Sequence, residues 1–247
     1  ALHCEIHEQS IFSRKNYFYP DLTKGYQITQ YDRPLATGGR LAIEREDGTV
    51  TEIGLERLHV EEDTGKSVHE GFKGADETTG LDFNRAGTPL AEIVSRPDMR
   101  TPAEAAAYMK ALRALLVACA VNDGNLEEGS LRCDGNISVR KIGAPQFGVK
   151  VEVKNLNSFR YLAKAIDYEI GRQVAALQAG ETIRQETRTF DPASNATLVM
   201  RVKEGADDSR SLTAPVPARK RRNQEMYGQA GHFQAWDPGI GSRKRDR

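Results

Sequence analysis

The sequence predicts an α+β fold: a largely antiparallel sheet with flanking helices, followed by a basic, disordered tail. Three observations favour this fold class. Runs that alternate apolar and polar residues are typical of half-buried strands, and two stretches with apolar residues at helical spacing are typical of amphipathic helices. Residues 209–247 combine basic runs with Pro and Gly and show no sustained periodicity, as disordered segments do.

Charge divides the chain into two parts. Residues 209–247 contain nine Lys/Arg and three Asp/Glu, so residues 1–208 are acidic although the whole chain has a net charge of zero. We expect a folded body at 1–208 and a tail at 209–247. The basic runs of the tail are either simply solvated, bind nucleic acid or act as a nuclear address. The three cysteines lack a Cys-x-x-Cys spacing, which excludes a disulfide framework and a self-contained zinc site. No signal peptide and no run of about 18 apolar residues is present, so no membrane segment is predicted.

The first well-defined element is a hairpin. Residues 41–46 and 50–62 read as strands joined through Asp47-Gly48, a strong turn signal. Alternation places Glu62 on an apolar face, with His59 and Glu61 on the other. A carboxylate on an apolar face is costly unless it is paired, protonated or bound to a metal, although the strand end could also fray into solvent.

Two helices frame a second hairpin. Thr101 and Glu104 form a capping box for a helix that ends before Asn122-Asp123-Gly124. Ser158 caps another, which ends at Gly180. Their expected buried stripes are Tyr108, Leu112, Leu115, Leu116 and Cys119 in the first helix, and Phe159, Leu162, Ile166, Ile170, Val174 and Leu177 in the second.

Between these helices, residues 131–140 and 149–154 alternate apolar and polar side chains and predict paired strands. Their polar face collects Asp134, Asn136, Glu152 and Lys154. Taken alone, this face is either an ordinary solvent-exposed surface or the floor of a polar site.

Carboxylates are unusually dense in the acidic body. They come from separate segments, at residues 61–63, Glu92, 127–128 and Asp134. Hard oxygen ligands of this kind are what Mg²⁺ requires, and Mg²⁺ often accompanies a nucleotide phosphate. Residues 63–67 (Asp-Thr-Gly-Lys-Ser) resemble the end of a P-loop, but Val60 stands where that motif needs its first Gly.

Six motifs in a fixed order identify the chain more closely. They lie at residues 14–21 (Arg-Lys-Asn-Tyr-Phe-Tyr-Pro-Asp), 26–30, 59–66, 82–95 (starting Asp-Phe-Asn-Arg-Ala-Gly), 127–134 (Glu-Glu-Gly-Ser-Leu-Arg-Cys-Asp) and 152–158. This series resembles the B subunit of the aspartyl/glutamyl-tRNA(Asn/Gln) amidotransferase family. The resemblance covers about residues 1–208, and it implies that family segments before Ala1 and after Asp208 are missing here.

The resemblance implies a ligase that forms C–N bonds with glutamine as the amide donor. Glutamate on tRNA(Gln), or aspartate on tRNA(Asn), is activated by ATP as an acyl phosphate, which ammonia then converts to the amide. In the family, the A subunit is an amidase that supplies the ammonia, the small C subunit clamps the two large subunits, and the other partner is misacylated tRNA. The implied cofactors are Mg²⁺ and ATP, and the implied location is the cytoplasm, the mitochondrial matrix or a plastid.

Carried over to this sequence, the resemblance implies a set of site residues. Glu62 and Glu92 resemble metal ligands, with Glu61, Glu128 and Asp134 as supporting carboxylates. Lys15 and Glu62 resemble the mouth of an ammonia channel. Tyr17 and Tyr19 resemble residues along that ammonia route, and Lys154, Asn155 and Asn157 resemble contacts to phosphate or to the tRNA end. All five count as implied contacts to substrate or nucleotide. The alternative hypothesis is a catalytically inactive fragment that binds tRNA or docks one of the other subunits.

Overall fold

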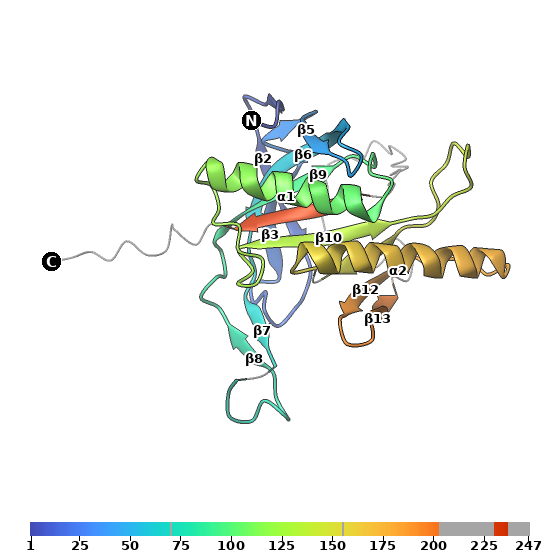
Figure 1. The fold of residues 1–247 in the computed structure, drawn as a ribbon. Coiled ribbons are helices and arrows are strands. Elements are labelled where there is room, and N and C mark those ends of the chain that lie inside the picture. The colour runs from blue at the N-terminus through green and yellow to red at the C-terminus, as the bar shows by residue number, and fades with distance from the viewer. Residues whose placement is uncertain (70, 155, 203–229, 237–247) are drawn as a thin grey trace, which may run out of the picture.

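The central element of the fold is a large, mostly antiparallel sheet with two helices along one face (Figure 1). The computed structural model describes residues 1–69, 71–154, 156–202 and 230–236, with side chains up to residue 200. This arrangement confirms the predicted α+β class. The strands are β1 (Glu5–Ile6), β2 (Ile11–Asn16), β3 (Tyr26–Arg33), β4 (Ala36–Thr37), β5 (Arg40–Glu44), β6 (Val50–Glu62), β7 (Lys66–Val68), β8 (Gly80–Asp82), β9 (Pro89–Ser95), β10 (Leu131–Ile137), β11 (Val151–Lys154), β12 (Glu186–Asp191), β13 (Ala196–Val202) and β14 (Ala230–Trp236).

The strands are not paired in chain order. The main path of the sheet runs β1-β4-β6-β9-β14-β10-β11-β12-β13, while β3 and β5 also pair with β6, and β2 pairs with β3. The pair β11 and β12 is parallel, as expected for two strands connected through a helix. The strands β7 and β8 form a separate hairpin that projects from one end of the molecule (Figure 1).

The helix α1 (Pro102–Ala118) begins where the sequence predicts. The Thr101 hydroxyl accepts a hydrogen bond from the amide of Glu104, and the Glu104 carboxylate accepts one from the Thr101 amide, which completes the capping box. The expected stripe is confirmed for Tyr108, Leu112 and Leu116, which are buried against the sheet. The last member of that stripe is wrong, because the helix ends at Ala118 and Cys119 is exposed.

The helix α2 (Phe159–Gln178) confirms the predicted cap, since the amide of Tyr161 donates to the Ser158 hydroxyl. Its buried line differs from the expected stripe. The buried residues are Leu162, Ala165, Glu169 and Gln173, whereas Leu177 is exposed. Two polar residues occupy the buried line because each meets polar groups there. Glu169 faces Arg188 of β12 and Thr197 of β13, and Gln173 donates to the Ile137 carbonyl of β10 and to Glu169.

The strand β6 carries a bulge that decides which side chains face the helices. Leu55 pairs with Ser95 and Arg57 with Val94, so Glu56 is an extra residue on β6. Leu55 and Leu58 therefore both pack against the core although they are three residues apart. After the bulge, Arg57, His59 and Glu61 point away from the helices, in agreement with the predicted alternation.

The strand β14 lies within the segment expected to be a disordered tail. Its backbone pairs with β9 on one side and with β10 on the other. The expectation of disorder does not hold for these seven residues, since a strand in this position satisfies the backbone groups of two neighbouring strand edges. The expectation for residues 203–229 and 237–247 lies outside the described residues.

Candidate functional site

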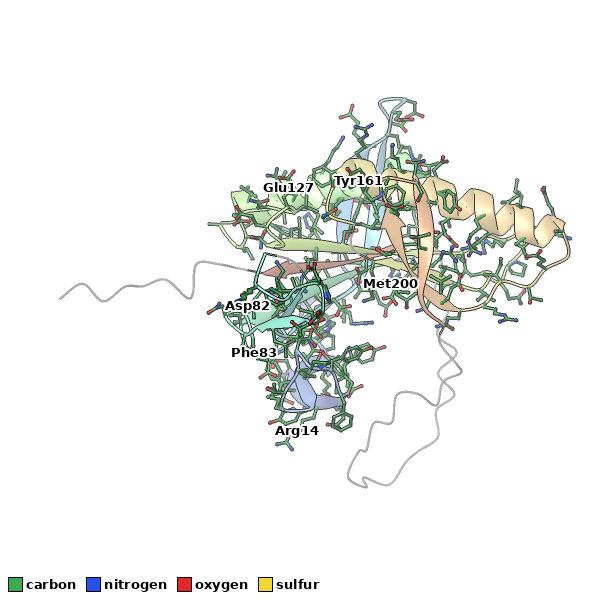
Figure 2. All side chains as sticks on the ribbon, turned by 90° about the horizontal axis from the view of Figure 1, so that it is seen from below. Arg14, Asp82, Phe83, Glu127, Tyr161 and Met200 are labelled. Atoms are coloured by element: carbon green, nitrogen blue, oxygen red, sulfur yellow. The ribbon has the colours of Figure 1, made fainter. Side chains whose placement is uncertain are left out.

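One face of the sheet is covered by the two helices and the other is lined with polar side chains. Figure 2 shows the helices along one side, with Asp82 and the β2 residue Arg14 on the opposite side. Antiparallel registers align these polar positions, because His59 pairs with Glu92, and Asn136 with Glu152. We call this surface the polar face. It comprises Arg57, His59, Glu61, Glu92, Arg132, Asp134, Asn136, Glu152 and Lys154.

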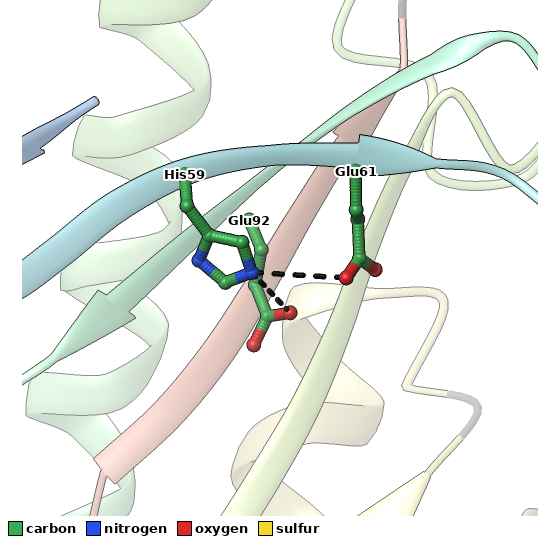
Figure 3. A group of neighbouring side chains, drawn as sticks. All are labelled: His59, Glu61 and Glu92. Atoms are coloured by element: carbon green, nitrogen blue, oxygen red, sulfur yellow. Dashed lines mark ion pairs between the residues drawn. The ribbon is translucent and has the colours of Figure 1, made fainter. Parts of the chain in front are cut away.

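A histidine and two glutamates converge on the polar face (Figure 3). His59 Nε2 lies 3.5 Å from a carboxylate oxygen of Glu92 and 3.7 Å from one of Glu61. One potential ligand atom from each residue lies within 4.8 Å of the other two. His59 and Glu61 are buried and Glu92 is partly buried. Two carboxylates and an imidazole so close together form a donor set for a divalent cation. We call His59, Glu61 and Glu92 the carboxylate cluster.

Glu62 does not join this group, although the sequence analysis expects it to bind a metal with Glu92. Its carboxylate pairs with Lys24 and accepts a hydrogen bond from the amide of Ile28 at 3.1 Å. The reason is alternation, which directs adjacent residues of β6 to opposite faces. The structure thus places Glu61, rather than Glu62, beside Glu92, and ion pairing compensates the Glu62 charge.

The predicted polar surface of β10 and β11 forms a second group. Lys154 Nζ lies 3.1 Å from Asp134 and 3.5 Å from Glu152, and the Thr187 hydroxyl donates to Glu152 at 3.0 Å. Burial favours the neutral amine, but the two carboxylates outweigh it and raise the pKa of Lys154 above its usual value. Lys154 therefore carries a full positive charge on this otherwise acidic surface.

Lys15, implied with Glu62 as a channel mouth, lies on β2, close to Tyr17 and Tyr19. Lys15 is exposed, with Nζ 5.6 Å from the centre of the Tyr17 ring, and the Tyr17 and Tyr19 rings contact edge to face at 5.8 Å. Burial, together with nearby carboxylates that include Glu61, raises the pKa of Tyr17 to about 12. Tyr17 is thus electrostatically coupled to Glu61. Lys15 and Glu62 lie on different strands, and Glu62 is already paired with Lys24.

Two further expected residues lie away from the polar face. Glu128 is exposed in the loop before β10, where its amide donates to Asn125. Asn157 lines a hollow of about 520 Å³ at the start of α2, together with Arg113 and Glu127. The structure does not bring either one to the His59 group, and Asn155 lies outside the described residues.

Unsatisfied polar atoms gather on and beside the polar face. Among the described residues, buried side-chain atoms without a hydrogen-bond partner include Thr29 Oγ1, Arg57 Nε, His59 Nδ1, Arg132 Nε and Asn136 Nδ2. Each such atom costs roughly 1–3 kcal/mol when it stays unpaired in a dry interior. A surface with several of them suits a polar ligand better than an apolar one.

Sequence reasoning missed His59 and a neighbouring charged group, Asp63 with Arg85 and Arg132. The signal for His59 was present, since alternation already placed it on the same face as Glu61. Asp63 was counted only as one of several carboxylates. No local pattern indicates that Arg85 and Arg132 meet at Asp63, because they come from a loop and from a strand far apart in the chain.

Comparisons with known proteins give consistent results. A family model described as the GatB/GatE catalytic domain matches residues 1–218, which extends past residue 208, where the sequence analysis ends the resemblance. The chain is similar to proteins named as the B subunit of aspartyl/glutamyl-tRNA(Asn/Gln) amidotransferase. The protein from Halorhodospira halophila is 48% identical over all of this chain and 54% of its own length, and that from Alkalilimnicola ehrlichii is 55% identical over 87% of this chain and 44% of its own.

The chain therefore spans about half the length of the curated relatives it matches. A third relative, from a Synechococcus strain, is 51% identical over all of this chain and 50% of its own length. In the described part of the chain, neither helix combines the length and the apolar character needed to cross a membrane.

Proposed function

Because this chain belongs to the GatB/GatE catalytic-domain family, we propose that it forms the catalytic cradle of an amidotransferase B subunit. Its reaction is the ATP-dependent amidation of glutamate on tRNA(Gln), of aspartate on tRNA(Asn), or of both. The cradle corresponds to residues 1–208, and residues 209–247 form a tail whose strand β14 joins the sheet of the cradle. The names of the relatives support the assignment, and the convergence of His59, Glu61 and Glu92 is the observation that carries it.

The reaction requires two anions, ATP and a side-chain carboxylate, to approach each other. Phosphoryl transfer depends mainly on charge neutralisation and alignment. The carboxylates of Glu61 and Glu92 fit Mg²⁺, which would neutralise the phosphates when bound; the imidazole of His59 also admits Mn²⁺ or Zn²⁺. In this proposal Glu61 takes the role that sequence reasoning gave to Glu62.

Residues of the polar face would orient the reactants. Lys154 keeps its proton between Asp134 and Glu152 and offers a fixed positive charge to a phosphate or a substrate carboxylate. Once the substrate carboxyl group is activated as an acyl phosphate, ammonia attacks its carbonyl carbon and phosphate leaves, which yields the amide. We propose that ammonia comes from an amidase partner in the same complex, which also holds a small third subunit, and that Tyr17 and Tyr19 lie along its route.

The experiment measures ATP binding to the full chain by calorimetry, with Mg²⁺, with Mn²⁺ and with EDTA. We expect cation-dependent binding that falls at least tenfold in Glu61→Gln and in Glu92→Gln, since each loses a charged ligand. Glu52→Gln, an exposed carboxylate on the same strand, is the matched control and should bind like the unmodified chain.

A second readout is amide formation on glutamyl-tRNA(Gln), with the assembled complex and ammonium chloride as the amide donor. Glu61→Gln and Glu92→Gln should lose this activity, and Glu52→Gln should keep it. If both cluster variants bind Mg²⁺-ATP and form amide at the unmodified rate, the proposed site is excluded.

A further inference from the structure

Near the carboxylate cluster, one buried carboxylate contacts two arginines. Asp63 is 3% exposed, and its Oδ2 atom lies 2.8 Å from Arg85 Nε and 2.8 Å from the terminal nitrogen of Arg132. The other oxygen of Asp63 accepts a hydrogen bond from the amide of Thr64 at 2.9 Å. Both guanidinium groups therefore share a single carboxylate oxygen.

This group carries an excess positive charge. Two guanidinium groups and one carboxylate leave a net charge of about +1, because arginine stays protonated in proteins. Burial, together with the nearby Arg132 charge, lowers the pKa of Arg85, although Asp63 and Asp82 oppose that change. The Nε atoms of both arginines are buried and make no hydrogen bond of acceptable geometry among the described residues.

The arginines remain reachable from solvent. The side chains of Arg85 and Arg132 are 20% and 32% exposed, in contrast to 2% for the side chain of Asp63. Asp63 is fixed by its backbone, since its amide donates to Thr88 and its carbonyl accepts from Gly87. The result is a rigid anchor with two guanidinium groups held at its solvent side.

The position of this group relates it to the proposed metal site. Asp63 follows Glu61 by two residues, and Arg132 and Glu92 both pair with the same residue of β14, Gln234. Two strand spacings separate the backbones of Arg132 and Glu92 by about 10 Å. An anion with several linked negative charges could thus contact the arginines while another part of it reaches the cluster.

We propose that Arg85 and Arg132 form an oxyanion subsite that takes a phosphate group of the nucleotide. The identity of the anion rests on the proposed function. Guanidinium groups bind phosphate oxygens through parallel, charge-assisted hydrogen bonds, and both side chains of this pair are partly exposed beside a carboxylate that neutralises only one of them. A purely structural bridge would need only one arginine for one carboxylate.

The test measures binding of inorganic pyrophosphate to the full chain by calorimetry, in EDTA and without added metal, so that it does not depend on the carboxylate cluster. Arg132→Gln should weaken binding about tenfold or more, as should Arg85→Gln, because each removes a charge-assisted contact. Each variant keeps Asp63 paired with the other arginine, so the fold is retained. Arg160→Gln, an exposed arginine of α2, should bind like the unmodified chain.

Arg132→Lys provides a second variant that retains the ion pair with Asp63 and loses only the planar fork, so its affinity should lie between those of Arg132→Gln and the unmodified chain. The subsite is overturned if the unmodified chain does not bind pyrophosphate, or if all arginine variants bind it equally well. Failure of the proposed function is distinct, because it concerns Glu61, Glu92 and the cation-dependent binding of ATP.

Discussion

Two groups of buried charged residues lie in and beside this sheet, and they differ in how closely their charged groups pair. Between α2 and the β12–β13 hairpin, Glu169 accepts hydrogen bonds from Arg172, Gln173 and Thr197. Arg188 in turn donates to Glu186 and to Thr197. On the polar face, by contrast, the His59 group holds its ring nitrogen 3.5 Å or more from the carboxylates and leaves Nδ1 unpaired.

The difference separates structural from functional charge. A buried ionic network with its partners in place fixes one element against another, and losing one member leaves the others uncompensated. A buried polar atom without a hydrogen-bond partner lowers the stability of the fold, and a ligand that bonds to it removes this cost. The same residue types thus tie α2 to the sheet in one place and suit ligand binding in the other.

The largest expected effect comes from breaking the ion-paired network around Glu169, in which, among the members named above, only Gln173 has a buried side-chain atom (Oε1) without a hydrogen-bond partner. Glu169→Gln should lower the free energy of unfolding by about 3–5 kcal/mol, because it leaves the guanidinium of Arg188 with less compensating charge in a buried position. Chemical denaturation of the full chain measures the change. Glu181→Gln, exposed just after the same helix, is the control and should stay within about 0.5 kcal/mol. If both variants changed the free energy of unfolding by a similar amount, the Glu169 network would not have the structural role assigned to it here.

The second prediction concerns the group of His59, Glu61 and Glu92. A cation that binds only the folded chain should raise its stability by about 2.7 kcal/mol at a concentration 100 times its Kd. Glu61→Gln should lose this gain, which is measured against the stability of the same variant without added cation. Denaturation with and without Mn²⁺ tests both statements, with Glu52→Gln as the control. A cation effect that persists in Glu61→Gln would contradict the assignment.

The third prediction compares two members of the ion-paired network around Glu169. Arg172 is its most exposed member, with a side chain 26% exposed, and it contacts Glu169 and Glu186. Its replacement in Arg172→Gln should cost only about 1 kcal/mol, since water can compensate part of the lost charge. Denaturation alongside Glu169→Gln compares the two costs. If both variants lost the same unfolding free energy, burial would not determine the cost of removing a charge from this network.

The smallest effect is a pH dependence at the polar face. The folded chain raises the pKa of Tyr17 from 10 to about 12, because burial and nearby carboxylates disfavour the phenolate. The neutral ring therefore contributes its full stability below pH 10, and this contribution is lost as the pH rises from 10 through about 12. Ultraviolet titration should show a tyrosine hydroxyl that ionises near pH 12 and is absent in Tyr17→Phe. If the two titration curves coincide above pH 10, the coupling is absent.

Much of the fold could be predicted because its signals are local. The capping box at Thr101, the Ser158 cap and the Asp47-Gly48 turn each depend on a few adjacent residues. Alternation along β10 and β11 also predicts which side chains share a face. The buried line of α2 could not be predicted from apolar spacing, because Glu169 is buried only where Arg188 and Thr197 meet it.

The sequence predicts which residues are candidates for the site, but it does not predict which of them lie side by side. Family motifs and carboxylate density identify Glu61, Glu92, Asp134 and Lys154 as residues of interest. Which glutamate lies beside Glu92 depends on the pairing of β6 with β9. A shift of one residue in that pairing would exchange Glu61 for Glu62, since the two point to opposite faces.

The sequence by itself determined the two helices, the two hairpins at residues 41–62 and 131–154, their two-faced character and the family. Tertiary structure alone decided three features: the bulge at Glu56, the insertion of β14 between β9 and β10, and the meeting of Arg85 and Arg132 at Asp63. The physical reason is the range of the interactions. Caps, turns and alternation act over a few residues, whereas register and charge pairing depend on which distant strands become neighbours.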